Sequence, residues 1–112
     1  MAKARRGRGP RPARVIWSPQ AADDLEQIVE FIARDSERYA AQVAADVIGA
    51  VERAADFPGA GRVVPELDDT AIREVFVYSY RIIYRVAGDT IHIAAIVHGA
   101  RDLSKALADR RV

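Results

Sequence analysis

The 112-residue sequence predicts an α+β domain with the element order β-α-α-β-β-β-α, in which a helical hairpin packs on one face of a mostly antiparallel sheet. Two observations predict this class. Apolar residues recur at helical spacing between residues 19 and 57, and the spacing changes to two between residues 72 and 97. The connections between the later strands are too short for parallel crossovers, which favours antiparallel pairing with the helices gathered on one face. The length suits one domain and is too small for two.

The first half of the chain is expected to supply a strand and two helices. Residues 14–18 are typical of a short strand. Ser18 and Pro19 then provide a helix N-cap and a proline at the first helical position. We expect this helix to end at residues 35–37 and a second helix to end at residues 57–59. Two helices with such a short break between them predict an antiparallel hairpin.

The second half is expected to supply three strands and a terminal helix. A loop over residues 58–70 precedes strands at residues 72–77, 80–87 and 90–97, and Gly88 with Asp89 marks a tight turn between the last two. Residues 101–111 are expected to form a short helix. The apolar stripes of the helices and one side of the strands predict a single core, made of Leu25, Ile28, Val29, Ile32, Val47, Ile48, Val51, Ile82, Tyr84, Ile91 and Ile93.

Composition excludes several classes of protein. The chain has no cysteine, which removes disulfide scaffolds and thiolate chemistry, and its two histidines are too few for a convincing metal site. No apolar run reaches the roughly 20 residues that a membrane-spanning helix needs. The lack of cysteine permits a reducing cytoplasm without proving one. We expect a cytoplasmic protein that uses no metal or other cofactor and has no membrane partner.

The charge is divided unevenly along the chain. The first 14 residues hold six basic side chains and no acidic one, whereas residues 15–112 hold 11 basic and 16 acidic side chains, a net charge of −5. Residues 1–13 are rich in arginine, glycine and proline and are expected to be a basic, disordered tail before a single domain over residues 14–112. Such a tail suits contact with a phosphate backbone or an acidic protein, or it is simply solvated.

Alternation along the last two strands separates an apolar side from a basic side. The apolar side is expected to lie on the helices and comprises Tyr80, Ile82, Tyr84, Val86, Ile91, Ile93, Ala95 and Val97. The opposite, open side is expected to carry Arg81, Ile83, Arg85, His92, Ile96 and His98, with Arg73 added from the preceding strand. Arg101 follows His98 by three residues. A basic face of this kind either binds phosphate through its guanidinium groups or is a solvated strand face without a function.

Four segments give the sequence a family resemblance. They are Ser18-Pro19-Gln20-Ala21-Ala22-Asp23-Asp24-Leu25, Phe57-Pro58-Gly59-Ala60-Gly61-Arg62, Tyr80-Arg81-Ile82-Ile83-Tyr84 and Val97-His98-Gly99-Ala100-Arg101-Asp102. In this order and spacing, over about residues 14–103, they resemble the RelE/ParE superfamily of bacterial toxins. The resemblance implies the toxin of a type II toxin–antitoxin pair, with a cognate antitoxin as its partner and with the hairpin-on-sheet fold expected above.

The resemblance leaves two branches open. ParE-like members bind DNA gyrase and block it without a catalytic step, whereas RelE-like members are ribosome-dependent endoribonucleases that cut mRNA. On the ribonuclease branch the resemblance assigns Arg81 and Arg73 to the arginines of the catalytic sheet, and Glu66 and His98 to the Glu/His pair of one subgroup. RNA cleavage needs a base, an acid and a cation that binds the phosphate.

Missing residue types favour the gyrase branch. The chain has only two lysines and no tyrosine after Tyr84, so the lysine-rich sheet and the C-terminal catalytic tyrosine of many RelE-like enzymes are absent. A net acidic domain is also poorly suited to ribosomal RNA. We therefore predict a ParE-like gyrase inhibitor that is not an enzyme, whose target- or phosphate-binding residues are Arg73, Arg81, Arg85, His98 and Arg101. The alternatives are an endoribonuclease that uses Glu66, Arg81 and His98 on mRNA at the ribosome, and an inactive toxin that mainly binds its antitoxin.

Overall fold

A computed structural model describes residues 11–110 and 112 of the chain. Its elements are, in chain order, β1 (Arg14–Trp17), α1 (Pro19–Ala33), α2 (Glu37–Asp56), the 3-10 turn η2 (Pro58–Ala60), β2 (Arg62–Val63), β3 (Ile72–Val77), β4 (Tyr80–Ala87), β5 (Thr90–His98) and α3 (Leu103–Ala106). Most of the expected basic tail of residues 1–13 lies outside the described residues, so its disorder stays a prediction.

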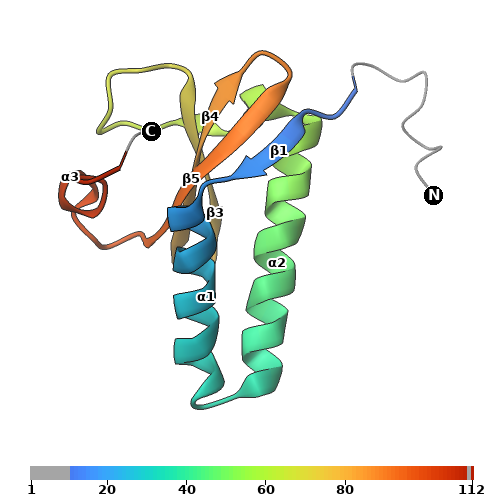
Figure 1. The fold of residues 1–112 in the computed structure, drawn as a ribbon, viewed down its shortest axis with the longest axis vertical. Helices are drawn as coiled ribbons and strands as arrows, with labels where there is room; N and C mark the ends of the chain where they lie inside the picture. The colour runs from blue at the N-terminus through green and yellow to red at the C-terminus, as the bar shows by residue number, and fades with distance from the viewer. Residues whose placement is uncertain (1–10, 111) are drawn as a thin grey trace.

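The strands form one sheet in the order β1-β5-β4-β3-β2. β1 pairs with β5 in parallel, and the other described pairs are antiparallel. α1 and α2 run side by side as a hairpin (Figure 1) and contribute to one core on the same face of the sheet. The predicted fold class and element order are therefore confirmed.

Two serines set the boundaries of the hairpin helices. The Ser18 hydroxyl accepts a hydrogen bond from the Ala21 amide at 3.0 Å, with Pro19 in the first turn of α1. The Ser36 hydroxyl accepts one from the Tyr39 amide at 3.0 Å and begins α2. A serine N-cap contributes about 1 kcal/mol, and each of these caps fixes a point where the chain changes direction.

A β-bulge in β5 changes which side chains face the helices. Ala94 is an extra residue without a partner on β4, and the alternation of β5 reverses beyond it. Ile96 and His98 therefore lie on the helix face, whereas Ala95 and Val97 lie on the opposite face. The sides predicted for these four residues were wrong because the prediction assumed unbroken alternation.

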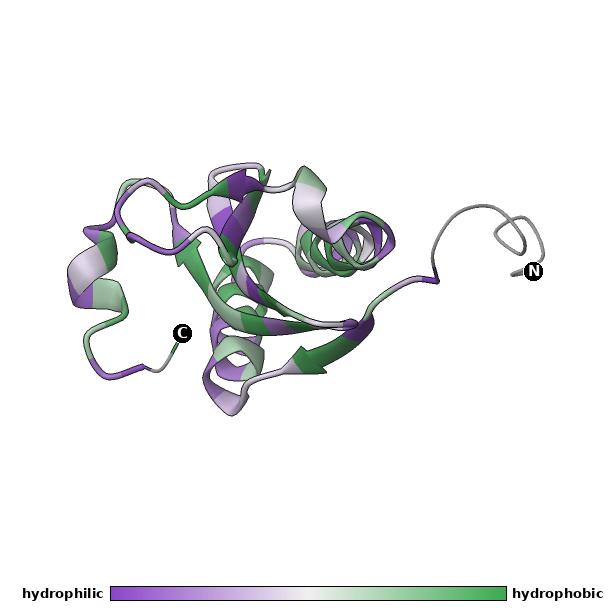
Figure 2. Ribbon diagram, turned by 90° about the horizontal axis from the view of Figure 1, so that it is seen from above, coloured by the Kyte–Doolittle hydropathy of each residue, from purple (hydrophilic) through white to green (hydrophobic). Residues whose placement is uncertain are grey.

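Both faces of the sheet are covered, with α3 and the two long helices on opposite sides (Figure 2). As predicted, the helix-side core includes Leu25, Ile28, Ile32, Val47, Val51, Ile82, Tyr84, Ile91 and Ile93. Two core predictions were wrong: Ile48 is 41% exposed, and Val29 is half-buried outside this core. The second core comprises Val64, Ile72, Ile83, Ala95, Val97, Leu103 and Leu107. The face expected to be open is therefore largely covered.

The C-terminal segment forms a strap over this second face. α3 is a single turn, shorter than the predicted terminal helix, and Leu103 and Leu107 enter the second core. Arg110 donates two hydrogen bonds to the carboxylate of Asp24 in α1, at 2.6 and 2.7 Å, and one to the Ala94 carbonyl at 3.1 Å. This ion pair ties the strap to α1 at the β5 bulge, and the hydrogen bonds to Asp24 raise the pKa of Arg110.

Candidate functional site

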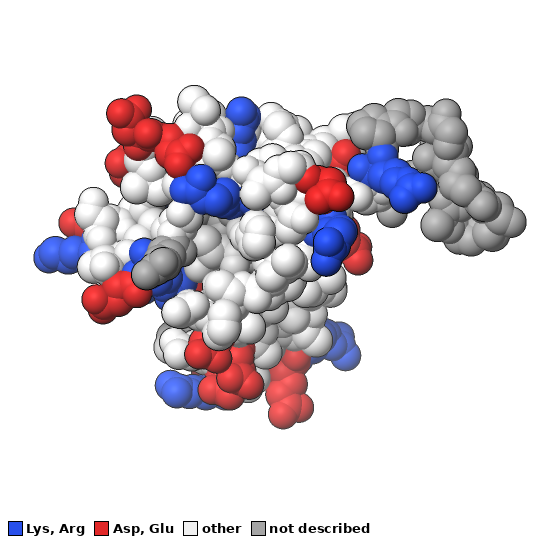
Figure 3. Space-filling model, turned by 45° about the horizontal axis from the view of Figure 1, so that its top comes forward, with Lys and Arg blue, Asp and Glu red and all other residues white. Residues whose placement is uncertain are grey.

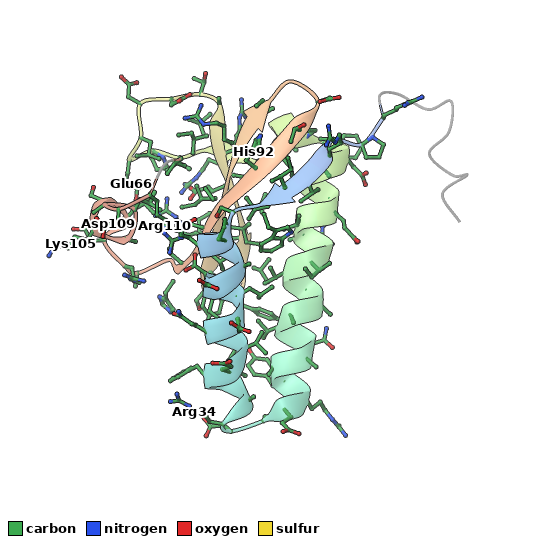
Figure 4. All side chains as sticks on the ribbon, in the orientation of Figure 1. Arg34, Glu66, His92, Lys105, Asp109 and Arg110 are labelled. Atoms are coloured by element: carbon green, nitrogen blue, oxygen red, sulfur yellow. The ribbon has the colours of Figure 1, made fainter. Side chains whose placement is uncertain are left out.

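The second sheet face contains a chain of four charged side chains. Arg81 of β4 is only 5% exposed. Its Nε donates to Glu74 at 2.6 Å, and its two terminal nitrogens donate to the Glu66 carboxylate at 2.8 Å each. Arg62 donates through its Nε to the other oxygen of Glu74 at 2.8 Å. The four side chains therefore follow one another in the order Arg62, Glu74, Arg81 and Glu66, so that positive and negative charges alternate and cancel. Glu66 lies on the α3 side of the molecule (Figure 4).

These contacts occupy Arg81 in the geometry that would otherwise hold a phosphate, because the bidentate pair of donors already binds Glu66. The hydrogen bonds from Arg81 lower the pKa of Glu66, which keeps this carboxylate ionised at neutral pH. The same hydrogen bonds raise the pKa of Arg81 above its ordinary value. An ionised carboxylate held by a guanidinium has no proton to donate and is a weak base.

Arg85 is also engaged, at the other end of the same face. It donates to Asp69 at 3.0 Å and to the main-chain oxygen of Val112 at 2.6 Å. His92 is its cross-strand neighbour on β5, and both side chains line a hollow of about 300 Å³. The pKa of Asp69 is lowered, first by the amide of Ala71 and then by Arg85.

Arg73 supports the turn before β2 instead of lying on the second face. It pairs with Tyr84 on the helix side of the sheet, so the predicted side was wrong. Its Nη1 donates to the carbonyls of Gly59 and Gly61 at 2.9 Å each, and the Tyr84 hydroxyl donates to the Pro58 carbonyl at 2.8 Å. A Cβ on Gly61 would lie 2.2 Å from the Tyr84 hydroxyl oxygen. Gly61 therefore permits the close packing of this turn against the sheet, which a larger residue would prevent.

His98 and Arg101 meet in a groove between α1 and the sheet, which we call the α1 groove. Its volume is about 200 Å³, and its lining includes Gln27, Ile28, Phe31, Tyr80, His98 and Arg101. The His98 ring packs edge-on to Tyr80, with ring centroids 5.7 Å apart. Phe31 is 65% exposed. The α1 groove thus joins exposed aromatic surface to two basic side chains.

A tight turn after β5 positions the two basic residues of the α1 groove. The Gly99 amide donates to the Ser79 carbonyl at 2.7 Å, and a Cβ on Gly99 would lie 3.1 Å from that oxygen. The His98 Nδ1 accepts a hydrogen bond from the Ala100 amide at 3.2 Å, and the Arg101 amide donates to the His98 carbonyl at 3.0 Å. These hydrogen bonds fix the backbone conformation of residues 98–101.

The structure therefore divides the predicted site residues instead of gathering them. Arg81 and Glu66 share one ion-pair network on the second face, and Arg85 lies farther along that face. His98 lies on the helix face with Arg101, so the predicted Glu66–His98 pair lies on opposite sides of the sheet. In the part of the chain that the structure describes, no group of three or more His, Cys, Asp or Glu side chains could hold a metal ion.

Exposed apolar side chains lie along both edges of the sheet. Phe57 and Phe76 are 68% and 53% exposed and flank a groove of about 190 Å³ between α2 and β3; we call this pair the β3-edge patch. The described pairing of β2 with β3 ends at Glu74, so the rest of β3 has a free edge there. Val15 and Ile16 are 37% and 41% exposed on β1, at the opposite edge.

Sequence reasoning missed four residues of these sites: Glu74, Phe31, Asp24 and Arg110. Alternation along β3 was a usable signal for Glu74, because it puts this acid on the same face as Ile72. Phe31 lies off the apolar stripe of its helix, which indicates an exposed aromatic. Nothing local joins Asp24 to Arg110, which are separated by 86 residues.

Comparison with known proteins decides the family. A family model described as "ParE toxin of type II toxin-antitoxin system, parDE" matches residues 15–103. The chain belongs to the ParE toxin family. It is thus a toxin of the type II toxin–antitoxin class within the RelE/ParE superfamily, as the sequence resemblance implied. No helix among the described residues of this ParE-family toxin is long and apolar enough to cross a membrane.

Relatives of this ParE-family toxin carry names from both branches. Toxin RelE2 of Caulobacter vibrioides is 36% identical over 90 residues, which cover 80% of this chain and 98% of the relative. A chain from the chromosomal ParDE system of P. aeruginosa has a TM-score of 0.64 at 20% identity and matches 77% of this chain and 95% of its own. A chain of the RelBE2 toxin–antitoxin complex of Mycobacterium tuberculosis has a TM-score of 0.53 at 20% identity, over 79% of this chain and 99% of its own. At this identity the two structures show the shared fold alone.

Proposed function

We propose that this ParE-family toxin inhibits DNA gyrase by binding it, without a catalytic step, and that a cognate antitoxin neutralises it. The observation that carries the proposal is the separation of Glu66 from His98 by the sheet. RNA cleavage requires an acid, a base and a cation around one phosphate. Here the carboxylate and the guanidinium of Arg81 neutralise each other on one face, and the imidazole lies on the other.

The α1 groove is the proposed contact with the target. Aromatic and arginine side chains carry much of the binding energy at protein interfaces, and Phe31, Tyr80 and Arg101 bring both kinds to one exposed hollow. In this proposal His98 contributes contact area and hydrogen bonding, and no proton transfer. The three sheet arginines then have structural roles, because each is held by carboxylates or main-chain carbonyls.

The β3-edge patch is the proposed contact with the antitoxin. Two exposed phenylalanines beside an unpaired strand edge are a liability for a protein that acts alone. An extended segment of a partner could add a strand to this edge and insert an apolar side chain between Phe57 and Phe76. The two structural neighbours come from a ParDE toxin–antitoxin system and a RelBE2 toxin–antitoxin complex, which supports a partner of this kind.

A ribosome-dependent endoribonuclease is the second candidate. The relative named Toxin RelE2, at 36% identity, favours it. On this branch the partners are the ribosome and mRNA, and Glu66, Arg81 and His98 would have to be brought to one phosphate by a rearrangement of the fold.

Two assays on the same purified protein distinguish the candidates. The toxin is added to a gyrase supercoiling reaction and to a cell-free translation reaction, in which mRNA ends are mapped by primer extension. We expect supercoiling to stop and mRNA to stay intact. New mRNA ends in the presence of ribosomes, with supercoiling unaffected, would replace the proposal by the second candidate.

Variants on the two surfaces provide matched controls. Phe31→Asp should lose gyrase inhibition while still binding the antitoxin, because Phe31 is exposed and lies in the α1 groove. Phe57→Asp with Phe76→Asp should weaken antitoxin binding and leave gyrase inhibition unchanged. If Phe31→Asp inhibits gyrase as well as the parent does, the α1 groove is not the target contact.

A further inference from the structure

The turn between β3 and β4 holds a tyrosine in a backbone conformation that suits glycine. Val77 pairs with Tyr80, so the turn consists of Tyr78 and Ser79 alone. Tyr78 has a φ of 53°, and in the part of the chain that the structure describes every other residue with a positive φ is a glycine. Gly88, with a φ of 60°, meets the same requirement without strain in the turn between β4 and β5. A bulky side chain at such a position costs free energy of folding, and strain of this kind is typical of functional sites.

The Tyr78 side chain lies against α2 on the outside of the molecule. It is 54% exposed, and its ring packs edge-on to the ring of Tyr39, with centroids 6.2 Å apart. Its hydroxyl donates a hydrogen bond to Asp46, whose other carboxylate oxygen accepts one from Gln42 at 3.0 Å. The hydrogen bond to Asp46 raises the pKa of Tyr78, so the hydroxyl stays protonated at neutral pH. The strained residue thus completes an exposed group of two aromatic rings and a carboxylate, which we call the tyrosine cluster (Tyr39, Tyr78 and Asp46).

The tyrosine cluster has the chemistry of a receptor for a cation. The faces of aromatic rings attract guanidinium and ammonium groups, and clusters of such rings are used to recognise cations. A carboxylate beside the rings attracts the same charge. Two exposed phenylalanines, Phe31 and Phe76, already have an arginine of this chain over the ring, at 5.7 and 5.4 Å from the ring centroid. No arginine or lysine among the described residues lies over either ring of the tyrosine cluster in this way, so both rings are available to a partner.

The charge of the surrounding surface has the sign that a cationic partner requires. Residues 19–56, which span α1, α2 and the break between them, hold nine acidic and three basic side chains, a net charge of −6. Residues 57–110 hold seven of each. Aspartate and glutamate side chains gather at the lower end of the molecule in Figure 3, where the hairpin lies. The acidic charge of the domain therefore belongs to the hairpin that carries Tyr39 and Asp46, and it attracts a basic surface toward the tyrosine cluster.

We infer that the tyrosine cluster receives an arginine side chain of the protein that the toxin binds through the α1 groove. One turn joins the two surfaces. Tyr80, two residues after Tyr78, lines the α1 groove, and the Ser79 carbonyl accepts a hydrogen bond from the Gly99 amide. Arginine suits the cluster because its planar guanidinium stacks on an aromatic ring and pairs with a carboxylate. The partner is gyrase, and this part of the inference rests on the proposed function.

The first arm of the test measures whether the cluster binds a cation. A fluorescein-labelled peptide of alternating arginine and glycine is titrated with the full-length toxin and followed by fluorescence anisotropy. The double variant Tyr39→Leu with Tyr78→Gly removes both rings and keeps every charge. In the matched control, Glu52→Gln removes a charge from the same helix at a separate hollow beside β1. Each exposed ring contributes about 2- to 5-fold to the affinity for a cation, so the double variant should bind about tenfold more weakly and the control should bind like the parent.

Glycine at position 78 separates binding from folding. Tyr78→Gly relieves the positive φ, so the urea midpoint of this single variant should be no lower than that of the parent. A distinctly lower midpoint would mean that Tyr78 serves the stability of the toxin itself, which overturns the inference. Equal peptide binding by the parent and the double variant would also overturn it, and so would a control that is weakened as much as the double variant.

The second arm is a gyrase supercoiling titration with the same proteins. The double variant should need about tenfold more toxin than the parent for half-maximal inhibition, and Glu52→Gln should inhibit like the parent. Equal inhibition by the parent and the double variant would overturn the inference and leave the proposed function intact. A parent that binds the peptide through the cluster but does not inhibit gyrase would support the cation site and refute the proposed function.

Discussion

Replacement of Arg81 tests whether this residue is structural, as its ion pairs indicate, or catalytic, as the ribonuclease alternative requires. The side chain of Glu74 is fully buried, and Arg81→Met leaves it with Arg62 alone, whose side chain is 60% exposed. Removing one partner of a buried ion pair costs about 3–5 kcal/mol, because the remaining charge stays buried. Glu66 adds little to this cost, since its side chain is 40% exposed and can be hydrated.

The effect is large enough to measure by urea unfolding. A small domain has a total stability of about 5–15 kcal/mol, so a loss of about 3–5 kcal/mol in Arg81→Met is at least about a fifth of it. With a denaturant dependence of about 2 kcal/mol per molar, the midpoint falls by roughly 1.5–2.5 M urea. The double variant Arg81→Met with Glu74→Leu removes both buried charges and should recover most of the loss, because apolar replacements of a whole pair are often neutral.

Two results would refute this reasoning. The first is an Arg81→Met variant as stable as the parent, which would mean that the network does not hold the sheet face together. The second is a double variant that is stable but no longer toxic while the parent cuts mRNA. That outcome would mean that the guanidinium acts on a phosphate, and that the ion pairs with Glu66 and Glu74 open when the toxin acts.

Three further outcomes are expected. Gly61→Ala should destabilise the fold by about 2 kcal/mol, since its Cβ would meet Tyr84, whereas Gly59→Ala, with nothing within 4 Å, should be neutral in a thermal melt. His98→Gln should keep its toxicity and its inhibition of supercoiling, because Gln preserves the hydrogen bonding proposed for His98. If His98 were a catalytic acid or base, the same change would lower the rate by about 10²–10⁴. The pKa of Glu66 is lowered in the folded state, so its contribution to stability is present above the ordinary glutamate pKa and is lost as the pH falls through the folded value. Glu66→Gln should therefore unfold more easily than the parent at pH 7, and the difference in urea midpoint should vanish in acid; a constant difference would contradict the assigned ion pair.

Local chemistry explains why most of the fold could be predicted from the sequence. Ser18 with Pro19 specifies a helix start within a few residues, and Gly88, with φ of 60°, is required at the hairpin turn between β4 and β5. The change of apolar period from helical to two separates the helices from the strands. Each of these signals depends on residues that are close together in the sequence, so a single sequence is enough to identify it.

The candidate site could not be predicted in the same way, because it depends on contacts between distant segments. The spacing of Leu103 and Leu107 indicates a helical turn, but it does not indicate that these leucines cover the second face of the sheet. The carboxylates that occupy Arg81 come from β3 and from the loop after β2, and their distance from it is set only when the sheet forms. Alternation alone therefore predicts an exposed arginine at position 81, where the folded protein has a buried ion pair.

The bulge at Ala94 decides on which face of the sheet His98 lies. With unbroken alternation, His98 would share a face with Arg81 and Glu66, and the chain would present the group of residues that the ribonuclease branch requires. Side chains outside β5 stabilise the bulge through two hydrogen bonds. The Ala94 carbonyl accepts one from Arg110, and the Ile96 amide donates one to the Asp24 carboxylate at 2.9 Å. The same ion pair that fastens the C-terminal strap to α1 thus also stabilises the register that keeps His98 in the α1 groove. A change of one residue in the register of β5 is therefore enough to decide which of these side chains share a face of the sheet.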